Sequence, residues 1–432
     1  MQRPAEQGAA VPREAAVDRA LGLAPFVGAL CGLVALLALA RAVSSTLVAL
    51  LVALETLHLL FMTVMWRRYR PAAPVEDAAL PLLTVVIPAF NEGPMVERSI
   101  RSAVAADYPR DRLEVLVVDD GSRDDTYFHM ARVLREQGEV VRVIRFRGNR
   151  GKRAALRAGF EAARGEVVVT IDSDSEIEPQ TLRAMASALV RDPRAGAVAG
   201  WVRVLNRDTL LGRMLDVQFT LSFDFARSAQ SAFGTVFVCP GALSAFRRAV
   251  ILPHLEAWTN QRFLGRPVGH GEDQALTNIV LRAGYDTIYE RAAVVWTLVP
   301  DRYRQLTRML TRWDRSYLVE GFSFARFMLS RYRDRSRLLP VLGFIASAFR
   351  LVYVAVGLVG LPALLLQRPE LVAKGALAGL AAAALASLYY VRVERSLRFL
   401  WGAAYAGYAL AGLQWVLPYA LLTVRDERWG TR

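Results

Sequence analysis

Acidic motifs, three of them with two or more carboxylates, occur at four points along the middle of this 432-residue sequence. The four clusters are Pro88-Ala-Phe-Asn-Glu92, Val118-Asp-Asp-Gly-Ser122, Asp172-Ser-Asp174 and Gly271-Glu-Asp273. Neighbouring carboxylates repel one another, so holding them together costs free energy unless a cation or a donor-rich ligand binds them. The clustering therefore indicates a site for a metal ion and a polar ligand.

Asp172 and Asp174 are the most suggestive pair, because alternate residues of an extended strand point to the same side. Two hard carboxylate oxygens on one side suit Mg²⁺ or Mn²⁺ bridging a diphosphate, where the metal neutralises the charge of the leaving group. An EF-hand is excluded because its glycine and distal glutamate are absent at the required spacing. An Asp-x-Asp pair alone is common by chance.

Each of the other acidic clusters also has a purely structural interpretation. Pro88–Glu92 fits a strand end with a turn, and Val118–Ser122 fits an Asx turn before a helix that starts at Thr126. Gly271–Asp273 suits a helix N-cap, and a carboxylate there can also act as general base on an acceptor hydroxyl. These two interpretations of Gly271–Asp273 are compatible.

A basic element, Asn149-Arg-Gly-Lys-Arg153, lies between the second and third acidic clusters. A lysine and an arginine after a glycine can contact phosphate oxygens. The pattern is too different from G-x-x-x-x-G-K-[ST] to be a P-loop. The alternative is a solvated helix start.

The elements that must position these motifs are short strands that alternate with helices. The predicted strands are Leu83–Pro88, Leu113–Asp119, Val140–Ile144 and Glu166–Asp172, and the predicted helices include Pro94–Ala106, Thr126–Gln137 and Ala154–Arg164. Buried β-branched runs separated by helices predict an α/β domain with a mainly parallel sheet. Ligands of such domains bind off the carboxyl ends of the strands, where the acidic clusters lie.

The composition outside this domain is that of a membrane protein. Hydrophobic residues make up 54% of the chain and the mean hydropathy is +0.26. Residues 1–20 are predicted to be a disordered tail, and residues 21–66 are predicted to form two N-terminal transmembrane helices. Arginines at 67, 68 and 70 follow directly, so the positive-inside rule places the α/β domain, residues 80–300, in the cytosol.

The C-terminal third is expected to return to the membrane. Residues 301–337 predict amphipathic helices on the membrane surface. Their apolar face would carry Tyr303, Leu306, Leu310, Trp313 and Tyr317, and another face Arg304, Arg308, Arg312 and Arg315. Residues 338–424 predict C-terminal transmembrane helices in three runs, Leu339–Leu366, Leu371–Val391 and Leu397–Val424. An odd number of spans would place the basic end outside, so the topology there stays open.

Charge and cysteine content narrow the partners and the compartment. The net charge of +14 fits cytoplasmic surfaces that face anionic lipid, and no nucleic-acid-binding module is present, so nucleic acid is rejected as a partner. Cys31 falls in an apolar run and Cys239 in the polar domain, which argues against a disulfide framework and fits a reducing cytosol.

Together, and in this order, the motifs and flanking apolar runs resemble the processive family-2 glycosyltransferases, in particular bacterial hyaluronan synthases and nodulation-type chitin oligosaccharide synthases. The motifs that carry the resemblance are Pro88–Glu92, Val118–Ser122, Asn149–Arg153, Asp172-Ser-Asp174, Cys239-Pro-Gly241, Gly271–Asp273 and Arg312-Trp313. The resemblance extends over about Leu83 to Tyr317 and implies a GT-A fold within an α-helical transmembrane protein.

The resemblance also implies a role for each matching residue. The donor-binding residues would be Ala89, Glu92, Asp119, Asp120, Lys152, Asp172 and Arg312. Asp174 would ligate Mn²⁺ or Mg²⁺, and Asp273 would be the catalytic base that deprotonates the acceptor hydroxyl, giving inversion at the anomeric carbon. Trp313 would stack on the acceptor sugar, with Cys239 and Gly241 lining the site and Cys239 not acting as a nucleophile.

The implied function is an inverting glycosyltransferase in a bacterial-type inner membrane. It would polymerise sugar from UDP-GlcNAc, alone or alternating with UDP-GlcUA, into hyaluronan or a chitin-like chain and export it. The alternatives are a non-processive transferase acting on a polyprenyl-phosphate or other lipid, and a cellulose or poly-N-acetylglucosamine synthase. A catalytically dead scaffold is disfavoured by the intact Asp120, Asp172, Asp174 and Asp273, and a transporter would not need an α/β domain of more than 200 residues.

Two positions depart from the family pattern. The usual Q-x-x-R-W motif reads Met309-Leu-Thr-Arg-Trp313, and methionine cannot donate the hydrogen bond of a glutamine amide. This departure bears on processivity and on the polymer, and leaves the donor site untouched. Gly271-Glu-Asp273 replaces the Gly-Asp-Asp more typical of hyaluronan synthases and keeps the aspartate expected to be the base.

Overall fold

The computed structural model describes residues 22–23, 27–28, 30–31 and 46–426. The expected tail, 1–20, lies outside the described residues, as does most of the first expected membrane run. The chain forms two compact units, one of Met1–Thr63 with Ala355–Ala411 and one of Val64–Val354 with Gly412–Arg432. The second unit contains the sheet and the candidate site.

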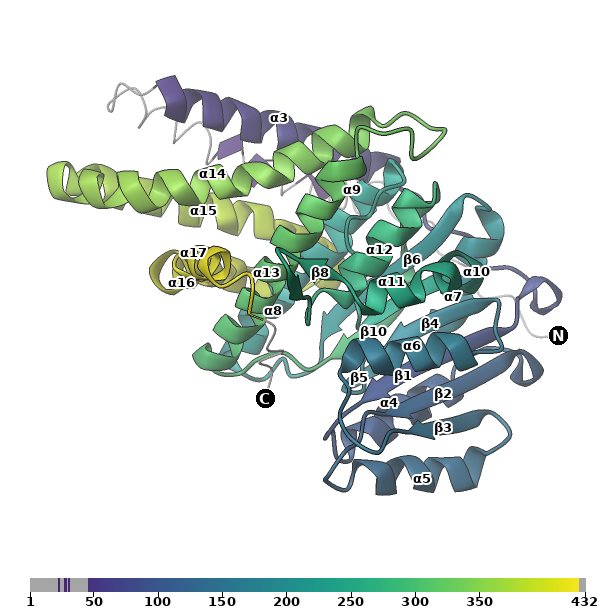
Figure 1. Ribbon diagram of the computed structural model, residues 1–432. Coiled ribbons are helices and arrows are strands. Elements are labelled where there is room, and N and C mark those ends of the chain that lie inside the picture. The colour runs from purple at the N-terminus through teal and green to yellow at the C-terminus, as the bar shows by residue number, and fades with distance from the viewer. Residues whose placement is uncertain (1–21, 24–26, 29, 32–45, 427–432) are drawn as a thin grey trace, which may run out of the picture. The chain divides into compact units, whose positions relative to one another are not determined.

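An eight-stranded sheet in the order β3-β2-β1-β4-β7-β6-β10-β5 is the centre of the second unit (Figure 1). Its strands are β1 (Leu83–Ala89), β2 (Leu113–Asp119), β3 (Val141–Arg145), β4 (Val167–Ile171), β5 (Ser175–Ile177), β6 (Ala195–Val204), β7 (Leu243–Arg247) and β10 (Asp286–Thr297). β3, β2, β1 and β4 are parallel, as are β6 and β10, whereas β7 and β5 are antiparallel to their neighbours. The predicted α/β fold with a mainly parallel sheet is confirmed.

Helices connect and cover the first four strands. α4 (Met95–Val104) and α5 (Thr126–Gln137) carry the chain from β1 through β2 to β3, and α6 (Lys152–Ala162) returns it to β4. β1, β2 and β4 are buried along their whole length, which explains why their sequences are almost continuously apolar. The three predicted helices are present, and α6 begins two residues earlier than expected.

The order of the strands reverses next to β1, because β2 and β3 extend the sheet on one side of it and β4 lies on the other. Right-handed crossovers then put α6 on the opposite face from α4 and α5. Such a reversal opens a crevice at the carboxyl ends of the strands, and ligands of α/β proteins bind there. The first three acidic clusters follow β1, β2 and β4, so they share this edge.

Further, mostly short elements complete this unit. They are α7 (Thr181–Arg191), α8 (Leu210–Phe219), the π-helix η3 (Thr220–Ala226), α9 (Arg227–Ala232), α10 (Arg248–Ile251), α11 (Leu255–Thr259), the hairpin strands β8 (Arg262–Phe263) and β9 (Arg266–Pro267), α12 (Glu272–Arg282), and the 3₁₀ turns η1 (Asp77–Ala79), η2 (Arg110–Arg112) and η4 (Leu252–His254). Of these, α12 carries the fourth acidic cluster at its N-terminus.

One helix, α13 (Tyr303–Phe327), replaces the several amphipathic helices expected in 301–337. It packs on α12 and on α17 (Val416–Leu422). The predicted basic face is only partly exposed, because Arg304 and Arg308 are exposed whereas Arg315 is buried and donates to Thr423 Oγ1 at 2.8 Å. Packing of α17 over α13 therefore overrides the pattern read from helical spacing, which is wrong for Arg315.

The remaining helices are α3 (Thr46–Arg68), α14 (Leu338–Gln367), α15 (Pro369–Glu394), η5 (Leu397–Phe399) and α16 (Leu400–Gly412). α3, α14 and α15 match three of the expected membrane runs. The last expected run, Leu397–Val424, is divided among η5, α16 and α17. Tyr303 of α13 donates to Gly412 O at 2.6 Å, at the break that precedes α17.

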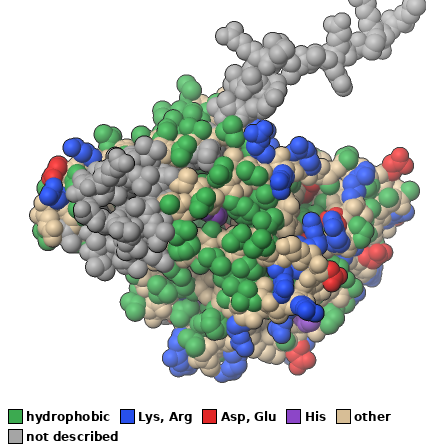
Figure 2. Space-filling model, turned by 90° about the horizontal axis from the view of Figure 1, so that it is seen from above, with side chains coloured by type: hydrophobic (Ala, Val, Ile, Leu, Met, Phe, Trp, Pro, Cys, Tyr) green, Lys and Arg blue, Asp and Glu red, His purple; other side chains and the backbone are tan. Residues whose placement is uncertain are grey.

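Among the described residues, one helix is long and apolar enough to cross a membrane. This helix is α15, and only 6% of its most apolar stretch is buried. Figure 2 shows hydrophobic side chains gathered over one face, with lysine and arginine side chains along part of the margin. The multi-pass arrangement stays a prediction.

A buried ion-pair network ties the connection between α13 and α14 to the sheet. Asp286, the first residue of β10, lies 2.9 Å from Arg333 Nη2 and 2.6 Å from Arg335 Nη1. Arg333 also donates to Thr235 Oγ1 at 2.9 Å. The side chains of Arg333 and Asp286 are 2% and 3% exposed, so each charge depends on the other for compensation.

We expect Asp286→Ala to destabilise the fold by about 3–5 kcal/mol, because it leaves the Arg333 guanidinium buried without a carboxylate. Unfolding of detergent-solubilised protein, followed by intrinsic fluorescence in denaturant, measures the change. Asp111→Ala is the matched control, since Asp111 is 82% exposed and lies 4.0 Å from Arg112; its effect should stay within about 0.5 kcal/mol. Equal effects of the two substitutions would show that the network contributes nothing specific.

Candidate active site

One open cavity of about 990 Å³ gathers most of the residues singled out from the sequence. Those that line it are Ala89, Glu92, Asp120, Lys152, Asp172, Asp174, Gly241, Asp273, Arg312 and Trp313. Asp119 and Cys239 do not line it. The volume lies at the upper end of the range for small-molecule sites, so the cavity has room for a large polar ligand.

The loops after β1 and β2 form one wall of the cavity and are tied together. Asn91 N donates to Ser122 Oγ at 3.1 Å. Glu92 N donates to Thr126 Oγ1 at 2.8 Å. Asn91 is left-handed, with φ 53°, a conformation that asparagine adopts more readily than most residues. Ala89 and Glu92 are thereby fixed against the second acidic cluster.

Asp120 shapes the basic loop that precedes α6. Its two carboxylate oxygens accept from Arg150 N at 2.7 Å and from Gly151 N at 2.8 Å. Burial raises the pKa of Asp120, and these two backbone donors oppose that shift. Gly121 allows the close approach, because a Cβ there would lie 2.4 Å from the carbonyl carbon of Gly148.

Asp119 lies below the cavity and is fully buried. Its carboxylate accepts from Ser122 N at 2.8 Å and lies 3.1 Å from Arg145 Nε. The Asx turn expected before the helix is formed instead by Asp124, whose Oδ1 accepts from Thr126 N at 3.1 Å. The structure therefore separates the two adjacent acids: Asp119 supports the loop from Asp119 to Ser122, and Asp120 faces the cavity.

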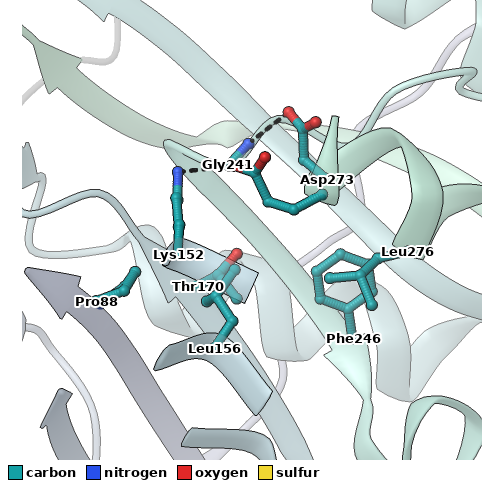
Figure 3. Close-up of a pocket in the computed structure, with 9 residues that line it drawn as sticks. Pro88, Lys152, Leu156, Thr170, Gly241, Phe246, Asp273 and Leu276 are labelled. Carbon is teal, nitrogen blue, oxygen red and sulfur yellow. Dashed lines mark hydrogen bonds and ion pairs between the residues drawn. The ribbon is translucent and has the colours of Figure 1, made fainter. Parts of the chain in front are cut away.

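Lys152, the first residue of α6, is held between two acidic side chains. Its Nζ lies 2.5 Å from Asp172 Oδ1 and 3.0 Å from Glu272 Oε1. Figure 3 shows the contacts of Lys152 and Asp273 side by side, with Leu156 and Leu276 also lining this part of the site. Although burial opposes the charge, Asp172 and Glu272 raise the pKa of Lys152, so it is an ammonium ion.

The third cluster is a turn rather than an extended strand, so the expected strand geometry is wrong. β4 ends at Ile171, and Ser175 N donates to Asp172 O at 3.1 Å. The turn is required because the next strand, β5, leaves β4 to pair with β10 at the other side of the sheet. Both carboxylates still line the cavity, with Asp174 Oδ1 3.4 Å from Thr297 Oγ1.

Asp273 is held by backbone donors and is the more basic of the two acids at the start of α12. Gly241 N donates to its Oδ2 at 3.1 Å and Gln274 N to its Oδ1 at 2.8 Å. Burial and the Glu272 charge raise the pKa of Asp273 to about 6. The pKa of Glu272 is lowered, because the Lys152 ammonium outweighs the effect of its burial. At neutral pH Asp273 is thus ionised yet ready to accept a proton.

α13 provides a second wall that carries Met309, Arg312, Trp313 and Tyr317. Their spacing puts them on one side of the helix, which faces the cavity. The Trp313 ring lies 6.1 Å from the ring of Phe219, giving an aromatic surface. The α12 N-terminus and α13 are in close contact, since a Cβ on Gly271 would lie 2.1 Å from Ser316 Oγ.

Cys239 lies outside the cavity, and its thiol is unreactive as a nucleophile. It is fully buried, and its backbone N donates to Thr277 Oγ1 at 2.9 Å. Burial raises the pKa of its thiol to about 12, so the thiolate needed for nucleophilic attack is not populated at neutral pH.

Arg153 is placed differently from the expectation that it contacts phosphate. It is buried, and it donates to Trp258 O at 2.7 Å and His270 O at 2.9 Å. Successive residues of a helix point in directions about 100° apart, so Lys152 and its neighbour cannot both face the cavity.

Several cavity residues were not foreseen. The sequence analysis gives Glu272 no role of its own. The Gly-Glu-Asp triplet nevertheless marks it as a second acid beside Asp273. Phe219, Phe223 and Arg227 line the cavity from α8, η3 and α9. No sequence motif marks these three residues, because only the π-helical segment and its packing bring them to the site.

The cavity therefore combines a basic residue and acids at the strand ends, a basic aspartate at the α12 N-terminus and an aromatic wall on α13. The ammonium can bind an anionic leaving group, the aspartate can take a proton from a hydroxyl, and the aromatic surface can stack on a sugar ring. The combination suits transfer of a group from a phosphorylated donor to an alcohol.

Comparison with known proteins places the chain among glycosyltransferases. A family described as glycosyl transferase family 2 matches residues 84–252. The N-acetylglucosaminyltransferase of Azorhizobium caulinodans is 32% identical over 366 residues, covering 83% of this chain and 90% of that protein. The hyaluronan synthase of Streptococcus pyogenes is 32% identical over 361 residues, covering 81% and 83%.

Among solved structures, a mannosyltransferase from Pyrobaculum calidifontis, in complex with GDP-Man and Mn²⁺, has a similar fold. The TM-score is 0.55 at 25% sequence identity, and the match covers 88% of this chain and 99% of the other.

Proposed function

Because the chain belongs to glycosyl transferase family 2 and is a hexosyltransferase with a GT-A fold, we propose that it builds a polysaccharide from a UDP-sugar donor. The donor is UDP-GlcNAc, used alone or in alternation with UDP-GlcUA. The observation that carries this proposal is the convergence of Lys152, Asp273 and Trp313 on one cavity. A single site thus contains a cation for the leaving group, a base and a surface that binds the acceptor.

The donor binds against the cavity wall that is formed by the loops after β1 and β2. Ala89, Glu92 and Asp120 surround the uridine, with Asp119 supporting the loop from below. Lys152 and Arg312 face the diphosphate, and Asp172 holds Lys152 in place. The relatives named as N-acetylglucosaminyltransferase and hyaluronan synthase support a GlcNAc-containing donor.

The acidic turn after β4 fits a divalent metal bound together with the donor. Asp174 offers hard oxygen ligands at the cavity, and Mg²⁺ or Mn²⁺ is commonly held by one or two carboxylates plus substrate phosphates. Among the described residues no cluster of three His, Cys, Asp or Glu side chains could hold an ion alone, which fits an ion that would be held jointly with the donor phosphates. When bound, the metal neutralises charge that develops on the diphosphate.

Transfer follows from the position of Asp273. Its carboxylate accepts the proton of the acceptor hydroxyl, the hydroxyl oxygen bonds to the anomeric carbon, and the bond from that carbon to the diphosphate breaks, releasing UDP. Attack from the side opposite the leaving group inverts the configuration. Trp313 stacks on the acceptor sugar, with Gly241 beside Asp273 and the buried Cys239 behind it as a support.

The acceptor chain and the membrane complete the proposal. The enzyme is a multi-pass protein of a bacterial-type inner membrane, with residues 80–300 in the cytosol and 301–337 at the membrane surface. α15 and the exposed apolar side chains of α14 and α17 support this placement. The second candidate is non-processive transfer to a lipid acceptor, which Met309 favours because it removes the usual glutamine of the acceptor-side motif.

Purified enzyme should release UDP from UDP-GlcNAc when Mn²⁺ or Mg²⁺ is present. UDP release is measured with UDP-GlcNAc, UDP-GlcUA and UDP-Glc, singly and in pairs. A requirement for both UDP-GlcNAc and UDP-GlcUA, with a hyaluronidase-sensitive product, identifies hyaluronan, whereas release from UDP-GlcNAc alone identifies a homopolymer. No release with any donor would reject the polymerase proposal and favour the lipid-acceptor alternative.

Asp273→Asn should lower kcat by about 10²–10⁴-fold, the range that general base catalysis supplies, and leave the Kd of UDP unchanged. In the parent enzyme the base must be ionised, and the pKa of Asp273 is raised to about 6, so kcat should fall as pH drops below 6. Steady-state rates between pH 5 and 8 test both points. Asp208→Asn, at an exposed position outside the cavity, is the control. Normal turnover in the Asp273 variant would refute its role as base.

Asp174→Ala should abolish the part of donor affinity that depends on metal. Calorimetry with UDP, with and without Mn²⁺, measures this dependence directly and needs no turnover. In the parent protein Mn²⁺ should tighten binding, and in the variant the two affinities should agree. A variant that keeps the metal effect would show that Asp174 is not the ligand.

A further inference from the structure

A buried polar chain lies behind the active-site cavity and is not part of its lining. Arg153, the second residue of α6, donates through Nη1 to Gln261 Oε1 at 2.8 Å. Through Nη2 it donates to His270 O at 2.9 Å, three residues before Asp273. One guanidinium thus fixes both the loop that leads to Asp273 and the amide of Gln261.

Gln261 passes this contact on to α13. Its Nε2 donates to Glu320 Oε1 at 2.6 Å, so the amide stands between the charges of Arg153 and Glu320. Glu320 is 1% exposed and lies two helical turns after Arg312 and Trp313. Burial raises the pKa of Glu320, and the hydrogen bonds that it accepts oppose that shift.

The chain closes on α12 as well. Asn278 Nδ2 donates to Glu320 Oε2 at 2.9 Å and to Glu320 O at 3.0 Å. Arg153, Gln261, Glu320 and Asn278 are called the rear network here. Its members come from α6, the turn before β8, α13 and α12.

The same elements carry the reacting groups. Lys152 begins α6, Asp273 lies in the first turn of α12, and Trp313 is on α13. These three residues must be correctly spaced for attack, and a displacement of about 1 Å can cost about 10²-fold in rate. In the cavity itself, α6 and α12 are joined by the ion pair between Lys152 and Glu272. Donor binding places the negatively charged diphosphate beside this pair.

We propose that the rear network is a positioning device, which keeps Asp273 and Trp313 in register with the donor held at Lys152. This inference rests on the proposed transferase function and adds residues that touch neither donor nor acceptor. Its members act through the backbone of the Asp273 loop and through α13, so they should affect turnover much more than donor binding.

Gln261→Met tests the proposal, because methionine has a similar length but neither donates nor accepts the two amide hydrogen bonds. We expect kcat, expressed per UDP-binding site, to fall about 10- to 100-fold, with the donor KM and the Kd of UDP within about twofold of the parent. A purely structural role would lower the thermal midpoint and the number of binding sites and leave kcat per site unchanged. That result would overturn the proposal.

A charge-relocating double variant, Gln261→Glu with Glu320→Gln, is the matched control. It moves the carboxylate from position 320 to position 261 and leaves every group with a partner. Arg153 and the new amide at 320 both donate to the carboxylate at 261, and Asn278 donates to the amide oxygen at 320. We expect kcat to recover to within about threefold of the parent. Gln261→Glu alone should stay impaired, since two carboxylates would then face each other. Failure of the double variant to recover would count against the proposal.

Hydrogen exchange separates this proposal from the function on which it rests. Gln261→Met should speed exchange in Gly269–Leu276 and Arg312–Tyr317, with the loops after β1 and β2 unchanged as an internal reference. The double variant should restore protection. If the parent enzyme is inactive with every donor, the proposed function fails, while unchanged exchange in these two segments would separately reject the rear network as a positioning device.

Discussion

The Lys152 ammonium, held between Asp172 and Glu272, is the contact on which the active site depends. Three carboxylates, those of Asp172, Glu272 and Asp273, approach one another where strand ends and a helix N-terminus meet. Without a cation among them they would take up protons or move apart. The lysine removes that cost and at the same time joins α6, the turn after β4 and α12. Under the proposed function, the donor diphosphate meets a positive charge already held in position, so little reorganisation is needed for binding.

The strand order explains why such distant residues meet. The chain builds the sheet outward from β1 to β3 and then returns to β4, so the loops after β1, β2 and β4 share one edge. β7 and β5 run against the parallel majority, and the departure of β5 toward β10 forces the turn that contains Asp172 and Asp174. α12 and α13 form another wall of the cavity, and their close contact at Gly271 leaves no room for a side chain there. The two walls thus come from separate parts of the sequence.

The sequence was informative where local pattern and tertiary role agree. Buried strands are apolar throughout, so β1, β2 and β4 could be recognised, and acidic residues at their ends could be assigned to one edge. It was less informative where one residue serves two partners. Arg315 has the spacing of an exposed face but is buried by α17, and Arg153 has the type of a phosphate ligand but binds backbone carbonyls. Such outcomes depend on which segments pack together, and helical periodicity contains no information about that.

In the Gly-Glu-Asp triplet, the different side-chain lengths give the adjacent acids Glu272 and Asp273 different partners. Glu272 is long enough to reach Lys152, and this pairing keeps it ionised with a lowered pKa. Asp273 is shorter and binds two backbone N–H groups, while the Glu272 charge and burial raise its pKa to about 6. The acid that neutralises the lysine is therefore the poorer base. Asp273, which forms no ion pair among the described residues, is the better one. A shorter residue at 272 would need Lys152 or α12 to shift to keep the pairing. The glutamate thus suits a spacing between α6 and α12 that the rear network also maintains.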